Sequence, residues 1–333
     1  MGQYSSCDLD DINPETEKEE NNYLQFVSNN INSWKKNNLN AFISKLSQGE
    51  KNNLNIFCII EGNNGNEVTK FVQNHFLNEL INEIKIKKDI KNAIEESFLK
   101  MNKLMEKEES MKEILDLRQK NNKEEIKKYK NIINDNKEKE INIFEEEDKE
   151  ILDYSGCTLC LILIDSDNNR LYFANIGNSE AFIYKNNNPN DVINLNSSHR
   201  PYQEKEKQRI GNDSLIINNK LYGVLKSART FGNFAYNNKK KIISDEPDIQ
   251  EYVINKEDKY IFVANEEVVN ILKQKNLNVA EIIKERKEID ENCPLEEILE
   301  EFFKDKISKY FFDNDTEQGF DNMTFTLIKL KNE

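Results

Sequence analysis

The chain has 333 residues, of which 37% are hydrophobic and 32% charged, and its formal net charge is −14. This length can bury a substantial core in one large domain or two ordinary ones. The negative charge argues against nucleic-acid binding, which depends on lysine and arginine neutralising phosphates, so we expect no nucleic-acid partner. No apolar stretch approaches the roughly 20 residues that span a bilayer, and we expect a cytoplasmic protein.

The first residues, MGQYSSCDLDD, contain the M-G-x-x-x-S pattern for attaching myristate to Gly2. One myristoyl chain gives only marginal membrane residence, and palmitoylation of Cys7 could supply a second anchor. An anionic leaflet would repel the acidic residues that follow. With lipidation the protein would lie at the cytosolic face of a membrane, with lipid as a partner. Without it, this segment is simply a flexible terminus.

Residues 1–31 are polar and acidic with little periodicity, and they predict a flexible leader before a domain over residues 32–333. Leu54–Ile60 reads as a buried strand. Two amphipathic helices follow the glycine loop, because apolar residues recur at helical spacing over 68–80 and 90–105.

A charged insertion interrupts this domain at about residues 106–150, where Lys, Glu, Asn and Ile dominate. A rough helical period over 126–133 favours a charged helical excursion over pure coil. A mixed charge run of this kind is usually a solvated face, although it could also bind a partner.

Beyond Ser155 the chain has the texture of a β protein. The strand candidates TLCLILID, NRLYFANIG, EAFIYK, KYIFVAN and MTFTLIKLK are rich in β-branched and aromatic residues. NVAEIIKERKEI and PLEEILEEFFKDKI read as helices between the last two strands. Long antiparallel strands flanked by helices predict the α+β class. The C-x-x-C of Cys157 and Cys160 lies inside an apolar run, so we expect buried strand cysteines rather than a metal or redox site.

The chain has only ten glycines, and eight of them fall in a spaced series: EGNNG, SGCT, ANIGNSEA, QRIG, LYGVLKSARTFGN and GFDNMT. The order and spacing resemble the metal-dependent type 2C (PPM) protein serine/threonine phosphatases. SGCTLCLILI and LYFANIGNSEAFIY resemble that family's S-G-S-T-A strand and Y-V-A-N-x-G-D-S-R-A hairpin. LNSSHRP, LKSARTFGN, YIFVANEEV and GFDNMT follow in the family's order. The resemblance runs from about Trp34 to the C-terminus and implies a four-layer α-β-β-α sandwich with two antiparallel sheets in the centre.

The resemblance also implies a chemistry. The family hydrolyses phosphate monoesters with up to two Mg²⁺ or Mn²⁺ ions that activate a water. Metal coordination can lower the pKa of a water from 15.7 to about 7 in the best-known case, an activation on the order of 10 kcal/mol. Such ions require carboxylate oxygens in near-ideal geometry. Without the ions this mechanism has no nucleophile.

Most family positions for metal and phosphate carry other residues here. The segment from Trp34 to Ala41 stands where the family has W-R-x-E-x-E-D-A, so Lys35 takes the phosphate-binding arginine position, and Leu39 and Asn40 are lost metal ligands. In EGNNG, Glu61 stands at the bridging aspartate and Gly62 is kept. Asn63 replaces the histidine proposed as general acid, which an amide cannot replace.

The remaining ligand positions lie towards the C-terminus. Glu266 stands at the aspartate of A-S-D-G, and Asn178 replaces the aspartate of a third, weaker site. Asn233 replaces the aspartate that closes S-R-A-x-G-D. Among the acidic ligands only Asp321 is unchanged, so Glu61, Gly62, Glu266 and Asp321 form a degenerate metal set.

Three hypotheses follow. In the first the protein is a pseudophosphatase that needs no cofactor and acts as a binding, scaffolding or regulatory module for a phosphoprotein or signalling protein, with Arg200, Arg229 and Lys35 as candidates for phosphate contact. In the second it is a divergent active phosphatase in which Glu61, Glu266 and Asp321 hold one or two Mg²⁺ or Mn²⁺ ions. In the third it is a lipid-anchored assembly component that uses its charged insertion.

Overall fold

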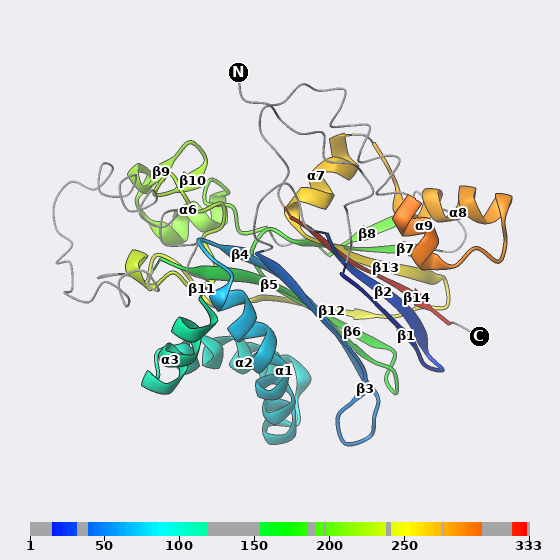
Figure 1. Ribbon diagram of the computed structural model, residues 1–333, viewed down its shortest axis with the longest axis horizontal. Coiled ribbons are helices and arrows are strands. Elements are labelled where there is room, and N and C mark those ends of the chain that lie inside the picture. The colour runs from blue at the N-terminus through cyan, green and yellow to red at the C-terminus, as the bar shows by residue number, and fades with distance from the viewer. Residues whose placement is uncertain are drawn as a thin grey trace. The chain divides into compact units, whose positions relative to one another are not determined.

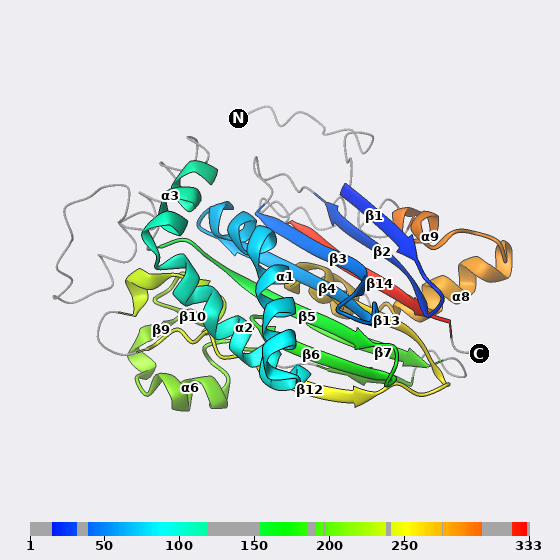
Figure 2. The ribbon, with the colours of Figure 1, turned by 90° about the horizontal axis from the view of Figure 1, so that it is seen from below.

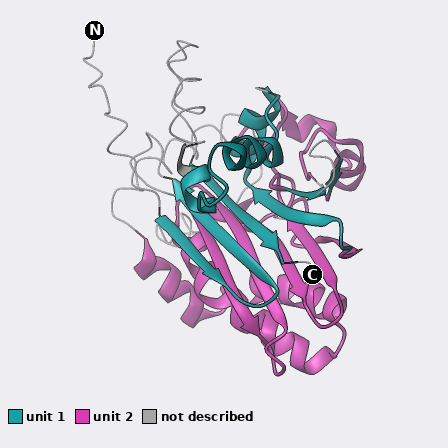
Figure 3. Cartoon of the chain, turned by 90° about the vertical axis from the view of Figure 1, so that its right-hand side faces the viewer, with its two compact units in different colours: residues 1–38, 181–194, 255–333 teal, residues 39–180, 195–254 magenta. Residues whose placement is uncertain are grey.

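The computed structural model describes residues 15–31, 39–118, 154–185, 191–195, 198–237, 241–274, 276–301 and 322–331. The chain forms two compact units, shown in Figure 3. Unit 1 comprises residues 1–38, 181–194 and 255–333, and unit 2 comprises residues 39–180 and 195–254. Gly2, Cys7, Lys35 and Asp321, together with most of the charged insertion, lie outside the described residues.

Unit 2 is built on an antiparallel sheet in the order β12-β6-β5-β4-β3, with the short β11 pairing with β5. The strands are β3 (Asn40–Gln48), β4 (Leu54–Asn63), β5 (Gly156–Asp165), β6 (Arg170–Ile176), β11 (Phe231–Gly232) and β12 (Asp248–Val253). Helices α1 (Glu67–Lys87) and α2 (Ile90–Met105) lie along one face of this sheet, and α3 (Glu108–Leu117) packs against these two helices (Figures 1 and 2). The two helices expected after the glycine loop are therefore confirmed.

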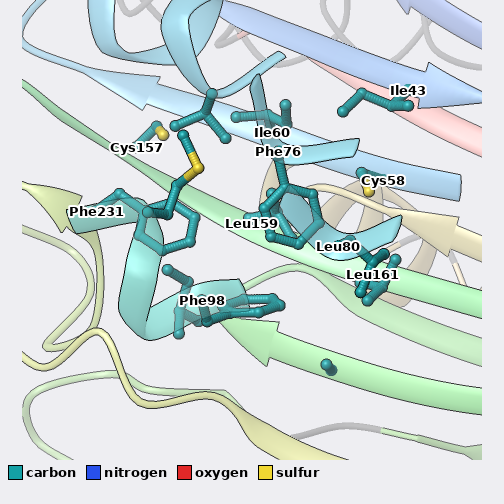
Figure 4. Packing of buried hydrophobic residues seen from close by; sticks show 14 of the residues in the cluster. Ile43, Cys58, Ile60, Phe76, Leu80, Phe98, Cys157, Leu159, Leu161 and Phe231 are labelled. Atoms are coloured by element: carbon teal, nitrogen blue, oxygen red, sulfur yellow. The ribbon is translucent and has the colours of Figure 1, made fainter. Parts of the chain in front are cut away.

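The core of unit 2 lies between these helices and the sheet. Phe76 of α1, Phe98 of α2 and Phe231 of β11 meet there, with Phe76 and Phe98 edge to face at a centroid separation of 5.2 Å (Figure 4). Cys58 and Cys157 contribute to the same core, and Cys160 is also buried, as expected. Burial raises the pKa of all three thiols. Because Phe231 is buried in this core and pairs with Cys157, the backbone that follows it lies beside Gly156 at the start of β5.

A smaller part of unit 2, in residues 198–237 and 241–247, has its own core of tyrosine and aliphatic side chains. Tyr222 stacks on Tyr236 at 5.2 Å, and Tyr154 meets Tyr236 edge to face at 5.6 Å. Its elements are α6 (Glu204–Ile210), the 3-10 helices η3 (Asp213–Leu215) and η4 (Phe234–Tyr236), and the two-residue strands β9 (Ile216–Ile217) and β10 (Lys220–Leu221).

Unit 1 is a second antiparallel sheet, in the order β1-β2-β14-β13-β7-β8, packed with helices α7, α8 and α9. The strands are β1 (Glu15–Glu20), β2 (Leu24–Ile31), β7 (Glu180–Lys185), β8 (Val192–Asn194), β13 (Asp258–Ala264) and β14 (Met323–Leu330). The helices are α7 (Glu266–Gln274), α8 (Val279–Ile289) and α9 (Leu295–Glu301). Antiparallel sheets with separate helices confirm the α+β class.

The prediction of a flexible leader through residue 31 is wrong. Residues 15–31 form β1 and β2, and β2 pairs with β14 over its full length. Leu24, Phe26 and Val27 are fully buried, and the polar Ser28, Asn29 and Asn30 that follow them are buried as well. Because these side chains are polar, the sequence pattern did not indicate a strand here.

The charged insertion is ordered at its start. Residues 108–117 form α3, whose Ile114 is buried in the unit 2 core. No helix of the described residues is both long enough and apolar enough to cross a bilayer.

Candidate functional site

The loop EGNNG is shorter than the sequence suggests, because β4 does not end at Ile60. Glu61, Gly62 and Asn63 still pair with Thr158, Cys157 and Gly156 of β5. A Cβ on Gly62 would lie 2.4 Å from the carbonyl oxygen of Leu39 and 2.5 Å from Oγ1 of Thr69, so only glycine fits. The side chains at 61 and 63 are therefore positioned by a central strand rather than by a flexible loop.

The strand register places the proposed lost ligands beside this strand end. Asn40 is directly opposite Glu61 in the β3–β4 pair, and the Gly62 amide donates to the Leu39 carbonyl at 3.1 Å. Directly paired residues in an antiparallel sheet have Cβ atoms about 5 Å apart. Opposite Glu61 and Gly62, the neighbouring chain segment therefore presents an aliphatic residue, Leu39, and a buried amide, Asn40, and no carboxylate.

An amide-to-amide hydrogen bond joins two of the substituted positions. Nδ2 of Asn233 donates to Oδ1 of Asn63 at 2.8 Å and to the carbonyl of Tyr154 at 2.7 Å, while Oδ1 of Asn233 accepts from Thr230. Asn233 is fully buried and has a left-handed backbone, with φ at 54°. The acceptor of Asn63 is thus engaged by a rigid partner, and the pair forms a neutral cross-link.

A second set of hydrogen bonds, which the sequence did not predict, stabilises the turn after β4. The Ser155 hydroxyl lies 2.6 Å from Oε1 of Glu67 and 3.0 Å from the carbonyl of Asn64, and Nδ2 of Asn64 donates to Tyr154. Glu67 is fully buried in the first turn of α1, where a carboxylate complements the helix dipole. The only feature of the sequence that marks Glu67 is its position at the start of a predicted helix.

Asn178 lies in the turn between β6 and β7. Its Nδ2 donates to the Lys226 carbonyl at 3.2 Å, while its buried Oδ1 has no hydrogen-bond partner within the described part of the chain. Gly177 beside it donates to Nδ1 of His199 at 3.0 Å. The turn is therefore fixed by hydrogen bonds to residues 199 and 226.

In unit 1, Asn265 links the start of α7 to the start of β14 through hydrogen bonds. Its backbone amide donates to the Thr324 carbonyl, its Oδ1 accepts from the Thr324 amide, and its Nδ2 donates to the Asn322 carbonyl at 2.8 Å. Glu266 follows directly and is buried. The structure thus joins Asn265, the residue before Glu266, to Asn322, the residue after Asp321.

Arg229 does not have a free guanidinium for phosphate. It is buried, with Nη2 2.7 Å from Oε1 of Glu206 and Nη1 3.1 Å from Oδ1 of Asp248. Burial by itself would raise the pKa of Glu206, and the hydrogen bonds and charges of Arg229 and Arg209 outweigh it, so this pKa is lowered. Arg229 therefore has a structural role. Arg200, which is half-buried, donates to the hydroxyl of Tyr202 at 3.1 Å.

The donors at the strand end do not fit a pair of hard divalent cations. Such ions prefer several carboxylate oxygens, whereas the positions around Glu61 carry Leu39, Asn40 and an Asn63 engaged by Asn233. In the described ranges, no three His, Cys, Asp or Glu side chains come together as a metal site would require. Asp321 lies outside those ranges.

Comparison with known proteins gives one family. Residues 106–314 match the family model described as protein phosphatase 2C. The chain is 27% identical to probable protein phosphatase 2C 3 of Paramecium tetraurelia over 92% of both chains. It is 28% identical to protein phosphatase 2C 1 of the same organism, over 84% of this chain and 83% of the relative.

Solved structures agree on the fold. The chain resembles a serine-threonine phosphatase 2C from Toxoplasma gondii with a TM-score of 0.60 and 13% identity, covering 96% of this chain and all of that one. At this identity the likeness concerns the fold alone. It agrees with the α+β class expected from the pattern of strands and helices.

Proposed function

Because the chain belongs to the protein phosphatase 2C family, we propose that it is a catalytically inactive member, a pseudophosphatase that serves as a binding, scaffolding or regulatory module. The family comprises metal-dependent serine/threonine phosphatases that act on phosphoproteins. We expect the partner of this chain to be a phosphoprotein or signalling protein as well.

The hydrogen bond between Asn233 and Asn63 carries this proposal. General acid catalysis needs a group that titrates, and an amide does not. The Asn63 position is also held by a buried partner at 2.8 Å, so it is not free to reorient towards a leaving group. Asn40 opposite Glu61 removes charge from the same strand end. Since changing even an outer partner of a metal ligand costs about 10- to 100-fold in affinity, several changes together should leave little metal binding.

The alternative is a divergent but active phosphatase that uses Mg²⁺ or Mn²⁺. Two observations favour it: the strand end still carries a carboxylate, Glu61, beside Gly62, and the curated relatives are named phosphatases. Under this alternative, Glu61, Glu266 and Asp321 are the residues that would hold an ion.

The two candidates differ in metal binding and hydrolysis. Purified protein would be titrated with Mn²⁺ in a calorimeter and assayed on an aryl phosphate and a phosphothreonine peptide. We expect no saturable binding in the millimolar range and no turnover. A Glu61→Ala variant and a control Glu95→Ala variant, altered on an exposed face of α2, would be assayed alongside. Metal-dependent turnover that disappears in Glu61→Ala but not in Glu95→Ala would establish the active alternative.

We also propose membrane attachment through a myristoylated Gly2, assisted by Cys7. The support is the sequence pattern alone. In a cell that acylates the protein, a Gly2→Ala variant should move from the membrane fraction to the soluble fraction. An unchanged distribution of this variant would contradict lipidation at Gly2.

A further inference from the structure

The turn between α1 and α2 carries a concentration of positive charge in an otherwise acidic protein. Residues 85–91 read KIKKDIK, with four lysines and one aspartate, against a net charge of −14 for the chain. Lys85, Lys87, Lys88 and Lys91 are all exposed. Figure 1 shows this turn at the lower edge of the view, where the two helices meet.

The turn is rigid. Lys88 adopts a left-handed conformation with φ at 58°, and its amide donates to the Ile84 carbonyl at 3.2 Å. Asp89 caps α2 by accepting from the Asn92 amide at 2.8 Å. Only these two residues separate the helices, so the lysines are held at fixed places around the turn.

Most of this charge is not neutralised locally. Lys87 lies 3.7 Å from Glu96, but Lys85, Lys88 and Lys91 have no acidic partner within ion-pair distance among the residues that the structure describes. Lysines at the end of α1 complement the helix dipole, which is a structural reason for Lys85 and Lys87. It does not account for the apolar residue between them.

Ile86, between Lys85 and Lys87, is the distinctive feature of the turn. Its neighbours Ile84 and Ile90 pack against the core of unit 2, whereas Ile86 is 67% exposed. An apolar side chain surrounded by lysines on a convex turn matches the interface of an anionic bilayer. There the lysines meet headgroup phosphates and carboxylates while the isoleucine enters the acyl boundary.

We propose that residues 85–91 form a docking surface for a membrane rich in anionic lipids. The net charge of −14 does not prevent this, because at physiological salt charges beyond about 8 Å are largely screened and the local charge governs contact. A lipid surface fits better than a free phosphate, since the lysines are spread around a convex turn and the exposed Ile86 needs an apolar partner. The proposal is independent of whether the phosphatase chemistry operates.

The test uses the full chain without acyl modification and vesicles of phosphatidylcholine, with or without phosphatidylserine. We expect sedimentation with the phosphatidylserine vesicles only, weakening as salt is raised. Lys85→Gln/Lys88→Gln/Lys91→Gln should lower the partition coefficient at least tenfold, since each lysine near such a surface contributes appreciably. Ile86→Gln should lower it several-fold.

Two matched controls separate this surface from a general charge effect. Lys103→Gln/Lys107→Gln/Lys112→Gln removes three exposed lysines around the opposite end of α2, and Ile289→Gln alters an isoleucine that is 77% exposed beside Glu288 and Asp290. Both should bind as the wild type does. The proposal is overturned if the wild type ignores the anionic vesicles, if the control triple variant loses as much binding, or if the protein binds soluble heparin but not vesicles.

Discussion

Removing the Arg229 side chain should strongly destabilise unit 2. It is buried between Glu206 and Asp248, and Glu206 is itself buried. Arg229→Ala leaves a buried carboxylate without its main partner, which typically costs about 3–5 kcal/mol. Urea unfolding would measure this loss. As the control, Arg170→Ala breaks a half-exposed pair with Glu251 and should cost less than about 1 kcal/mol. Equal effects of the two substitutions would contradict the buried network.

His199 should make stability depend on pH in a defined window. Burial lowers its pKa from 6.5, while Asp248, with Oδ2 3.3 Å from Nε2, opposes this shift. A lowered histidine pKa means that the unfolded chain binds the proton more tightly. The free energy of unfolding should therefore fall as pH drops below 6.5.

The carboxylates of the same cluster act in a lower window. The pKa of Glu206 is lowered from 4.5 and that of Asp248 from 3.8, so their contribution is lost only as pH falls below about those unfolded values. Between pH 6.5 and 4.5 the slope therefore reports mainly His199. We expect His199→Asn to flatten it in urea unfolding across that range. An unchanged slope in this variant would show that another group controls the acid response.

At the scale of the elements, β2 is the strand that the N-terminal segment contributes to the core. Leu24, Phe26, Val27 and Ile31 are all buried, and burying one such side chain fully contributes about 1.5–3 kcal/mol. Four of them together are comparable with the whole stability of a typical domain, about 5–15 kcal/mol. In contrast, β1 lies at the sheet edge and its side chains are mostly exposed.

Two truncations distinguish these strands. Deleting residues 1–20 removes β1 and should leave a soluble, cooperatively folded protein. Deleting residues 1–31 also removes β2, exposes the edge of β14 and should give insoluble protein. Solubility and thermal melts are the measurements, and a well-folded product of the longer deletion would mean that β2 is dispensable.

The same strand shows where sequence reasoning succeeds and fails. Strands such as β5 and β14 are runs of mainly apolar residues that include several β-branched side chains, so their pattern predicts them directly. In β2, Ser28 and Asn30 are polar but buried, because Ser28 hydrogen-bonds with Thr326 and Asn30 accepts from Thr324. Polar residues satisfied by a partner about 300 residues away leave no local signal of burial.

The candidate site, like the strands, could be predicted from the sequence only in part. The glycine series predicts the positions of Glu61, Gly62 and Asn63, because a strand and a helix flank them. The cross-link to Asn233 could not be predicted, since it joins residues 170 positions apart and needs the left-handed backbone of Asn233. Helical periodicity could not predict either that Glu67 is buried or that its carboxylate lies beside the Ser155 hydroxyl.

At the scale of the whole molecule, the charge of the protein bears on whether it binds nucleic acids. The four lysines of the α1–α2 turn are too few to neutralise the many phosphates that nucleic-acid binding requires, and the chain as a whole has a net charge of −14. We therefore expect no binding to duplex DNA or single-stranded RNA at physiological salt. Fluorescence anisotropy with labelled oligonucleotides would measure this. Strong binding that falls steeply with salt would contradict the expectation, and the Lys85→Gln/Lys88→Gln/Lys91→Gln variant would then show whether the α1–α2 turn is the cause.

The amide pair at the end of β4 couples the residues that positions 63 and 233 can accept. If Asn233 were changed to aspartate alone, its new oxygen would face Oδ1 of Asn63 and the Tyr154 carbonyl at 2.7–2.8 Å with no proton between them. If Asn63 were changed to histidine first, an imidazole N–H could donate to that aspartate. The tolerance of a substitution at either position therefore depends on the residue at the other, and on the order in which the two changes are made.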